Sequence, residues 1–372
     1  MFSQPDRAEF LPLAQLPSLV GGLMALGYQC LGPAQENGAI VMRELESPGD
    51  LPRGLQAEQA PGRYRLTSDP HNRYFGWANG PQALKPLTFA PRESLWRVER
   101  DEAGDLRFAA AQPAVARQAV IGVRACDLAA LALQDAHFLR EERRDPQYAQ
   151  RRESLFLVAV QCAEPAATCF CASTGDGPTP TAGYDIALAE LADGFVAVAG
   201  SERGDALLTS LHLAPAASGQ IDAARQQGQS AAAAQTRSLP AGNLRDRLMS
   251  RLEHPRWDDV ASRCLACGNC TAVCPTCFCH AEVDVPALDG GSSEHARNWD
   301  SCFGEAHGHL HGFNVRPDIR SRYRQWLTHK LATWHDQFGR SGCVGCGRCI
   351  AWCPVGIDLT EEVAALTAGG QS

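Results

Sequence analysis

The chain has 372 residues, a formal net charge of −8 and 16 cysteines. It is long enough for two or three domains, and its net negative charge differs from the basic surface that nucleic-acid-binding proteins use. No apolar run reaches the roughly 18 residues of a membrane-spanning helix, and the polar, acidic start has no basic and apolar leader. We therefore expect a cytoplasmic protein whose cysteines bind metals rather than form disulfides.

The first 240 residues predict an α/β or α+β domain. Short apolar runs predict strands at 119–123, 155–160 and 195–199, and a segment rich in helix-forming residues predicts a helix at 127–139. Turn-forming and aromatic residues at 61–80 indicate an ordered loop.

Segment 214–242 has the composition of a linker. It contains glycine, proline and a low-complexity run at 226–236, although its alanines would also permit a helix. We place a domain boundary near residue 240, which divides the chain into 1–240 and 241–372. Leucines at four-residue steps then predict a helix over 243–253.

The second domain contains two copies of the spacing Cys-x-x-Cys-x-x-Cys-x-x-x-Cys-Pro. This spacing is typical of bacterial ferredoxins that bind [4Fe–4S] clusters. One alternative is zinc, but zinc sites more often use separated Cys-x-x-Cys pairs. The other is the spacing of radical-SAM enzymes, which occurs at Cys270, Cys274 and Cys277 but overlaps the first copy. The full double pattern favours electron-carrying clusters over both alternatives.

In the ferredoxin pattern, the fourth cysteine of each copy binds the cluster of the other copy. We therefore predict that cluster 1 is bound by group 1, which is Cys264, Cys267, Cys270 and Cys353. Cluster 2 is predicted to be bound by group 2, which is Cys343, Cys346, Cys349 and Cys274. The alternative is that each copy binds one cluster with its own four cysteines.

Residues 316–338, between the two copies, predict a helix. Its aromatic and apolar residues recur at three- and four-residue steps, and we expect this stripe to face the core. The part of the chain after residue 240 is thus predicted to be a helical ferredoxin-like domain with two [4Fe–4S] clusters. Gly268, Gly345 and Gly347 are expected to let backbone N–H groups approach the clusters, because such hydrogen bonds tune reduction potentials.

Four more cysteines, group 3, occur in the first domain: Cys126, Cys162, Cys169 and Cys171. Cys126 and Cys162 each follow a predicted strand, and parallel strands would bring both to the carboxyl edge of one sheet, where α/β proteins place their sites. Cys126 also begins a predicted helix, which favours the thiolate. We predict that group 3 binds a third [4Fe–4S] cluster; the alternative is buried structural cysteines.

Cys277, Cys279 and Cys302 are open to two interpretations. They could bind a further cluster, with a histidine from His307, His309 or His311, or they could pack beside cluster 1. The histidines of this region are expected to be surface or core residues more often than ligands; they are His295, His307, His309, His311 and His329. Cys30 is isolated in the sequence and is expected to be inert.

The sequence has no glycine-rich dinucleotide pattern after a strand and no phosphate-binding Gly-Lys-Ser/Thr loop. We therefore expect no flavin or nucleotide on this chain. No nucleophile and base can be paired, so no catalytic residue is predicted. These observations favour an electron relay, and a metal-binding interaction module without redox function is the alternative from another class.

Several phrases resemble the iron–sulfur beta subunit of cytoplasmic sulfhydrogenases, the soluble NAD(P)-linked nickel–iron hydrogenases, and the related electron-transfer subunit of anaerobic sulfite reductase. They are Gly-Val-Arg-Ala-Cys-Asp-Leu at 122–128, Cys-Phe-Cys at 169–171, Cys-Pro-Thr-Cys-Phe-Cys at 274–279, Arg-Tyr-Arg-Gln-Trp-Leu-Thr-His-Lys at 322–330, and the second cysteine copy through Asp358. Ala125 stands where the family pattern has proline, next to an unchanged Cys126.

The resemblance implies an electron-transfer subunit of a soluble hydrogenase complex. Its implied partners are a flavin subunit that binds NAD(P)H and the large and small nickel–iron hydrogenase subunits. The alternative implied by the same phrases is the electron-transfer subunit of an anaerobic sulfite reductase, whose partner carries sirohaem.

Overall fold

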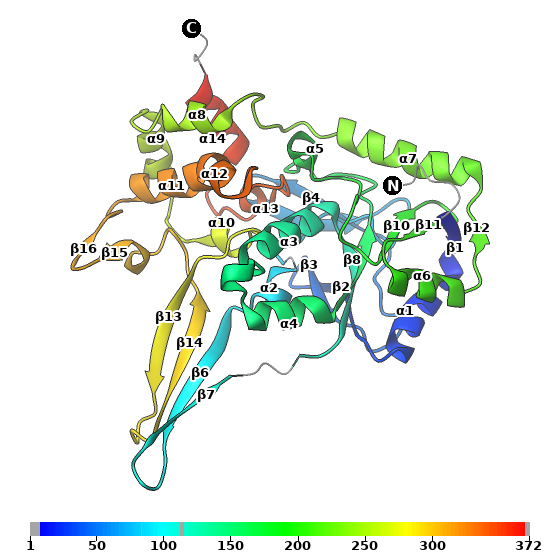
Figure 1. Cartoon of the computed structure of the whole chain (residues 1–372). Helices are drawn as coiled ribbons and strands as arrows, with labels where there is room; N and C mark the ends of the chain where they lie inside the picture. Colours follow the sequence, from blue (N-terminus) through cyan, green and yellow to red (C-terminus); the bar gives the residue numbers. More distant parts are fainter. Residues whose placement is uncertain (1–7, 83, 112–114, 369–372) are drawn as a thin grey trace.

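The computed structural model describes residues 8–82, 84–111 and 115–368 (Figure 1). Its centre is an eight-stranded sheet in which the four middle strands β10, β9, β8 and β2 run parallel and the outer strands are antiparallel. In spatial order, the strands are β12 (Ala214–Pro215), β1 (Ala8–Pro12), β11 (Gly194–Ala199), β10 (Ile186–Glu190), β9 (Leu155–Val160), β8 (Gln118–Val123), β2 (Gln29–Glu36) and β3 (Ala39–Glu44).

The three predicted strands are confirmed as β8, β9 and β11, and their apolar runs are buried on both faces of the sheet. Both faces need helices because parallel sheets bury both sides. Helices α1 (Leu16–Ala25) and α6 (Glu202–Ser210) cover one face. The other face packs against α3 (Ala125–Phe138) and α7 (Ser218–Ala233).

Most of the segment predicted to be a linker is helical. Residues 218–233 form α7, which buries Ile221, Ala224, Gly228 and Ala231. These residues recur at three- and four-residue steps, so a narrow stripe of small side chains suffices to hold the helix against the sheet. The low-complexity composition hid this stripe, because its exposed positions hold similar small and polar residues.

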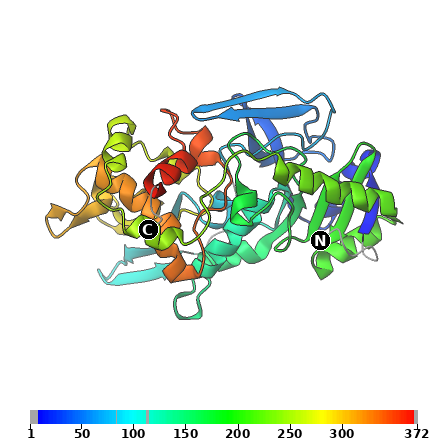
Figure 2. The same ribbon diagram turned by 90° about the horizontal axis from the view of Figure 1, so that it is seen from above.

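The region after residue 240 is mainly helical, as predicted, and forms one end of the molecule, opposite β1 and α7 (Figure 2). The aromatic stripe over 316–338 is confirmed as core. The predicted helix begins at Ile319, three residues later than expected, and reaches Phe338 through a π-helical turn, His329–Thr333, between α11 and α12. The helices are α8 (Leu244–Met249), α9 (Arg256–Arg263), α10 (Asn269–Ala272), α11 (Ile319–Thr328), α12 (Trp334–Phe338), α13 (Arg348–Ala351) and α14 (Leu359–Thr367).

A second, four-stranded antiparallel sheet projects from the body as a long ribbon (Figure 1). Strands on both sides of residue 240 build this ribbon; the division of the chain at that residue stays a prediction. In spatial order, they are β13 (His280–Pro286), β14 (Ser292–Trp299), β6 (Arg92–Arg100) and β7 (Leu106–Ala110).

The remaining elements are short. Two small hairpins lie outside the sheets, β4 (Leu55–Ala60) with β5 (Arg63–Ser68), and β15 (His309–Leu310) with β16 (Phe313–Asn314). The short helices are α2 (Lys85–Thr88), α4 (Pro146–Ser154) and α5 (Cys171–Thr174). Over the described ranges, no helix is both long and apolar enough to cross a bilayer.

Candidate metal centres

The structure brings the four cysteines of group 1 together. Cys264 ends helix α9, Cys270 lies in α10, and Cys353 follows α13. Burial raises the pKa of Cys270, and the negative charges of Cys264, Cys267 and Cys353 raise it further. All four cysteines line one cavity with Tyr323 and other apolar residues. A cysteine of the second copy therefore lies with three of the first, as the crossed arrangement requires.

Group 2 has the same crossed arrangement. Burial raises the pKa of Cys349, and the charges of Cys343, Cys346 and Cys274 add to that effect. Cys274 comes from the first copy, and the other three come from the second. The negative charges of neighbouring thiolates disfavour one another, and a bound metal would stabilise them. The cysteines of groups 1 and 2 therefore fit the ligands of clusters. That they bind clusters stays a prediction.

Backbone N–H groups point to the sulfurs at equivalent places in both copies. The Ala266 N–H donates to Cys264 Sγ at 3.4 Å, and the Gly345 N–H donates to Cys343 Sγ at 3.5 Å. Each donor is two residues after the first cysteine of its copy. The Ile357 N–H also donates to Cys353 Sγ at 3.3 Å. Hydrogen bonds to sulfur make a bound cluster easier to reduce.

Gly345 and Gly347 also allow close packing between the two halves of the chain. A Cβ on Gly345 would lie 2.5 Å from the backbone N of Cys171, and one on Gly347 would lie 2.4 Å from the carbonyl oxygen of Thr168. Both glycines have positive φ. The Phe170 N–H donates to the Gly345 carbonyl at 2.8 Å in the same contact. The loop of group 3 therefore lies directly against the second cysteine copy.

The crossed arrangement gives a test by substitution. Cys353→Ser is expected to remove about one cluster, the one on Cys264, Cys267 and Cys270, although Cys353 belongs to the other copy. Cys274→Ser is expected to remove cluster 2 instead. Unfolding should also become easier in both variants, because cluster binding stabilises the folded state. EPR spectra of the two reduced variants distinguish the clusters, and loss of the cluster of the substituted copy in each case would contradict the crossed assignment.

Group 3 gathers at the carboxyl edge of β8 and β9, where it was predicted. Cys126 is the second residue of α3, and Cys162 follows β9. Burial, then the charges of Cys171 and Cys162, raise the pKa of Cys169 well above its ordinary value. Cys346 of group 2 also lies close, in one buried cluster with Cys126 and Cys171. Groups 2 and 3 are therefore neighbours.

The thiolate form expected at Cys126 from its place at a helix start is not favoured for the side chain alone. Cys126 is buried, and burial, followed by the charge of Asp127, raises its pKa well above the ordinary value. Desolvation by the surrounding core disfavours the thiolate and so opposes the effect of the helix start. A bound metal would be needed to stabilise this thiolate.

Polar side chains that the sequence analysis did not identify donate to the sulfurs of group 3. Asn79 Nδ2 donates to Cys126 Sγ and Gln235 Nε2 to Cys171 Sγ, each at 3.2 Å. Asn79 and Gln235 lie far from these cysteines in the sequence, so no local pattern marks them. Donors of this kind orient ligands and tune a bound cluster.

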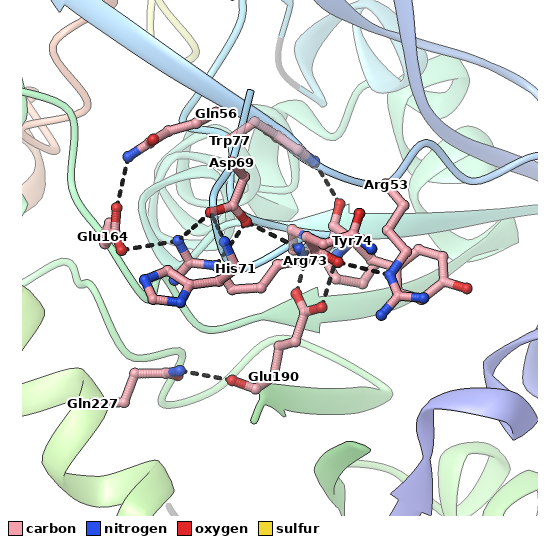
Figure 3. Close-up of polar contacts among 12 residues, drawn as sticks. Arg53, Gln56, Asp69, His71, Arg73, Tyr74, Trp77, Glu164, Glu190 and Gln227 are labelled. Atoms are coloured by element: carbon pink, nitrogen blue, oxygen red, sulfur yellow. Dashed lines mark hydrogen bonds and ion pairs between the residues drawn. The ribbon is translucent and has the colours of Figure 1, made fainter. Parts of the chain in front are cut away.

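A network of charged residues fixes the two loops around group 3 (Figure 3). Arg73 forms a two-pronged ion pair with Asp69 and also contacts Glu164, at 2.8 Å, in the loop that follows Cys162. Buried Glu190, at the end of β10, accepts from the backbone N–H groups of Tyr74 and Phe75 at 2.7 and 2.8 Å. The start of the segment that carries Asn79 is thus held by carboxylates to the end of β10 and to the loop after Cys162.

The remaining cysteines separate into two kinds. Cys30 lies in the core of the large sheet, whereas Cys279 contacts Cys302, and Cys277 contacts Cys274 of group 2. His307 also contacts Cys279. Of the other histidines, His309 and His311 are exposed on the β15–β16 hairpin, His295 lies on the ribbon between two acidic residues, and His329 begins the π-helical turn.

Among the residues that the structure describes, no three His, Cys, Asp or Glu side chains come close enough to hold a single metal ion. A four-iron cluster is a larger body than one ion, and its ligand sulfurs lie further apart than the four ligands of one zinc ion.

Comparisons with known proteins agree with this chemistry. Residues 263–357 match the family model described as a 4Fe-4S dicluster domain, which includes both cysteine copies, so this region binds [4Fe–4S] clusters. The chain is also similar to sulfhydrogenase 2 subunit beta of Pyrococcus furiosus, with 30% identity over 292 residues that cover 77% of this chain and 83% of the relative. No solved structure matches the chain significantly.

Proposed function

Since this chain belongs to the family of sulfhydrogenase beta subunits, we propose that it is the electron relay of a cytoplasmic hydrogenase complex, between a flavin subunit that binds NAD(P)H and the nickel–iron subunits. Flavins exchange electrons in pairs with nicotinamides, whereas a [4Fe–4S] cluster, when bound, stores one electron at a time. A subunit with several clusters can therefore connect two unlike reactions.

The observation that carries the proposal is the adjacency of groups 1, 2 and 3. Cys349 of group 2 lines the cavity of group 1, and Cys346 of group 2 lies in one buried cluster with Cys126 and Cys171 of group 3. The chain's own residues supply the spacing between these groups, the burial and the hydrogen bonds to sulfur. Electron transfer along this path requires no proton transfer and no change of covalent bonds.

Group 1 offers the route to a partner. Cys267 is exposed, and the apolar side chains of Leu265 and Val355 beside it are 62% and 39% exposed. Groups 2 and 3 are more enclosed, since five of their eight cysteines are buried and none is exposed. We propose that a partner subunit docks over group 1 and exchanges electrons there.

Mass analysis of the co-purifying subunits separates a nickel–iron partner from the sirohaem partner of a sulfite reductase.

The relay is tested by Cys346→Ser in the assembled complex. We expect hydrogen-linked reduction of NAD(P) to fall at least tenfold, while hydrogen-to-dye and NAD(P)H-to-dye activities largely survive, because dyes take electrons without crossing the relay. Cys30→Ser is the matched control, since Cys30 lies in an apolar core away from the other cysteines. Equal loss of all three activities in an intact complex would assign this chain a catalytic role, and an unchanged physiological rate would place cluster 2 off the path.

A further inference from the structure

We propose that Cys277, Cys279, Cys302 and His307 form group 4, a further binding site for a [4Fe–4S] cluster, with three thiolate ligands and one imidazole ligand. This site is separate from groups 1, 2 and 3, and it lies beside Cys274 of group 2. It extends the relay but does not depend on the identity of the partner subunits.

The ribbon brings these residues together from two parts of the chain. Cys277 and Cys279 lie just before β13, and Cys302 lies just after β14. The two strands pair from His280 with Trp299 onward, and the Asp300 N–H donates to the Cys279 carbonyl at 2.9 Å. The base of the hairpin therefore holds the Cys279 and Cys302 side chains in contact, and the two sulfurs would move apart to bind a cluster.

His307 has the surroundings of a ligand. Its Nδ1 lies 2.6 Å from Asp300 Oδ2, and the ring contacts Cys279. A histidine that binds a metal commonly uses one ring nitrogen for the metal and the other for a carboxylate, which fixes the ring. His309 and His311 are exposed on the neighbouring hairpin, so the structure selects His307 from the three candidates.

Two buried lysines provide an independent reason to place an anion here. Lys330 is 4% exposed, and its Nζ donates to Cys274 Sγ at 3.3 Å and Thr276 Oγ1 at 2.8 Å. Lys85 is 5% exposed and donates to the carbonyls of Thr271 and Ala272 at 3.2 and 3.1 Å.

Neither lysine pairs with a carboxylate in the described part of the chain; their polar partners are sulfur, hydroxyl and carbonyl groups. The Lys85 and Lys330 Nζ atoms also lie 3.9 and 5.8 Å from the ring centres of Trp299 and Trp334, which offer no negative charge. A buried cation without a counter-anion is strongly disfavoured. The thiols of Cys277 and Cys274 are the acidic groups whose charges act on both lysines. Thiolate-bound clusters at groups 2 and 4 carry net negative charge and would balance the two cations.

Iron and sulfide analysis tests the site in the full-length chain after anaerobic reconstitution. Cys302→Ser is expected to lower the content by about four iron and four sulfide per chain relative to the unsubstituted protein. Cys30→Ser, the same change at a cysteine without such neighbours, should leave the content unchanged. The proposal would be overturned if Cys302→Ser kept the iron and sulfide content of the unsubstituted protein. It would also be overturned if the unsubstituted protein contained about one zinc per chain and the variant had lost it.

His307→Cys keeps the proposal testable if Cys302→Ser does not fold. A thiolate in place of the imidazole should retain the iron, but shift the EPR signal of one cluster and lower its reduction potential, because a thiolate is the more anionic ligand. His311→Cys is the matched control and should leave every signal in place. An unchanged spectrum in both variants, with full iron content, would remove His307 from the site. Loss of the relay in Cys346→Ser is measured separately, so either proposal can fail alone.

Discussion

Arg348→Ala is expected to destabilise the folded chain by about 3–5 kcal/mol, because it leaves a buried carboxylate without its partner. Arg348 is fully enclosed, and its guanidinium contacts both carboxylate oxygens of Asp127 in α3, at 2.6 and 3.0 Å. It also donates to the carbonyls of Gly80 and Gln82 at 3.0 and 3.1 Å. One side chain of the second cysteine copy thus satisfies acceptors from two segments of the first 240 residues.

Arg245→Ala is the matched control for this prediction. Arg245 also forms an ion pair, with Asp336 at 2.7 Å, but both side chains are nearly half exposed. Exposed pairs of this kind contribute little to stability, so the control should unfold almost like the unsubstituted chain. Anaerobic denaturant titration followed by circular dichroism measures the difference, and equal midpoints for the two variants would contradict the structural role of Arg348.

Lys330→Met is expected to lower the reduction potential of cluster 2 by roughly 100 mV. The buried cation lies against Cys274, and a positive charge favours the reduced, more negative state of a neighbouring cluster. At an effective dielectric constant of about 20, a unit charge about 6 Å away contributes roughly 3 kcal/mol. For one electron this energy corresponds to roughly 120 mV.

The potential is measured by redox titration followed by EPR, and iron content is checked in the same samples. Lys330→Arg keeps the charge and should retain most of the potential. A Lys330→Met protein with full iron and an unshifted potential would show that this lysine does not act on cluster 2. A loss of iron from Lys330→Met would instead show that its charge is needed for cluster binding.

The sequence was most informative where local chemistry determines structure. Strands β8, β9 and β11 were predicted from their short apolar runs, which the sheet buries on both faces, and the aromatic stripe of α11 follows helical spacing. Each cysteine copy is a local pattern as well. The crossed grouping of Cys274 and Cys353 was inferred from chemistry common to two-cluster ferredoxins, and the structure places both cysteines accordingly.

The parts that were missed depend on contacts between distant segments. Asp127 and Arg348 each look like an ordinary charged residue until folding buries them together. Asn79 and Gln235 reach group 3 from loops and turns whose positions no periodicity encodes. Helix α7 was assigned as a linker because its buried stripe consists of small residues, which carry little hydrophobic signal.

The ribbon has a consequence for how the chain folds during synthesis. Ser292 of β14 pairs with Glu99 of β6, which is about 190 residues earlier, so the hairpin β6–β7 leaves the ribosome long before its partner strand exists. Until then β6 has a free edge that could pair with other chains. The charged side chains along β6, which are Arg92, Glu93, Arg97, Glu99 and Arg100, discourage such pairing at an open edge. The base of the ribbon, with Cys279 and Cys302, closes only after β14 is made, so any metal bound there arrives late, after translation has passed the first cysteine copy.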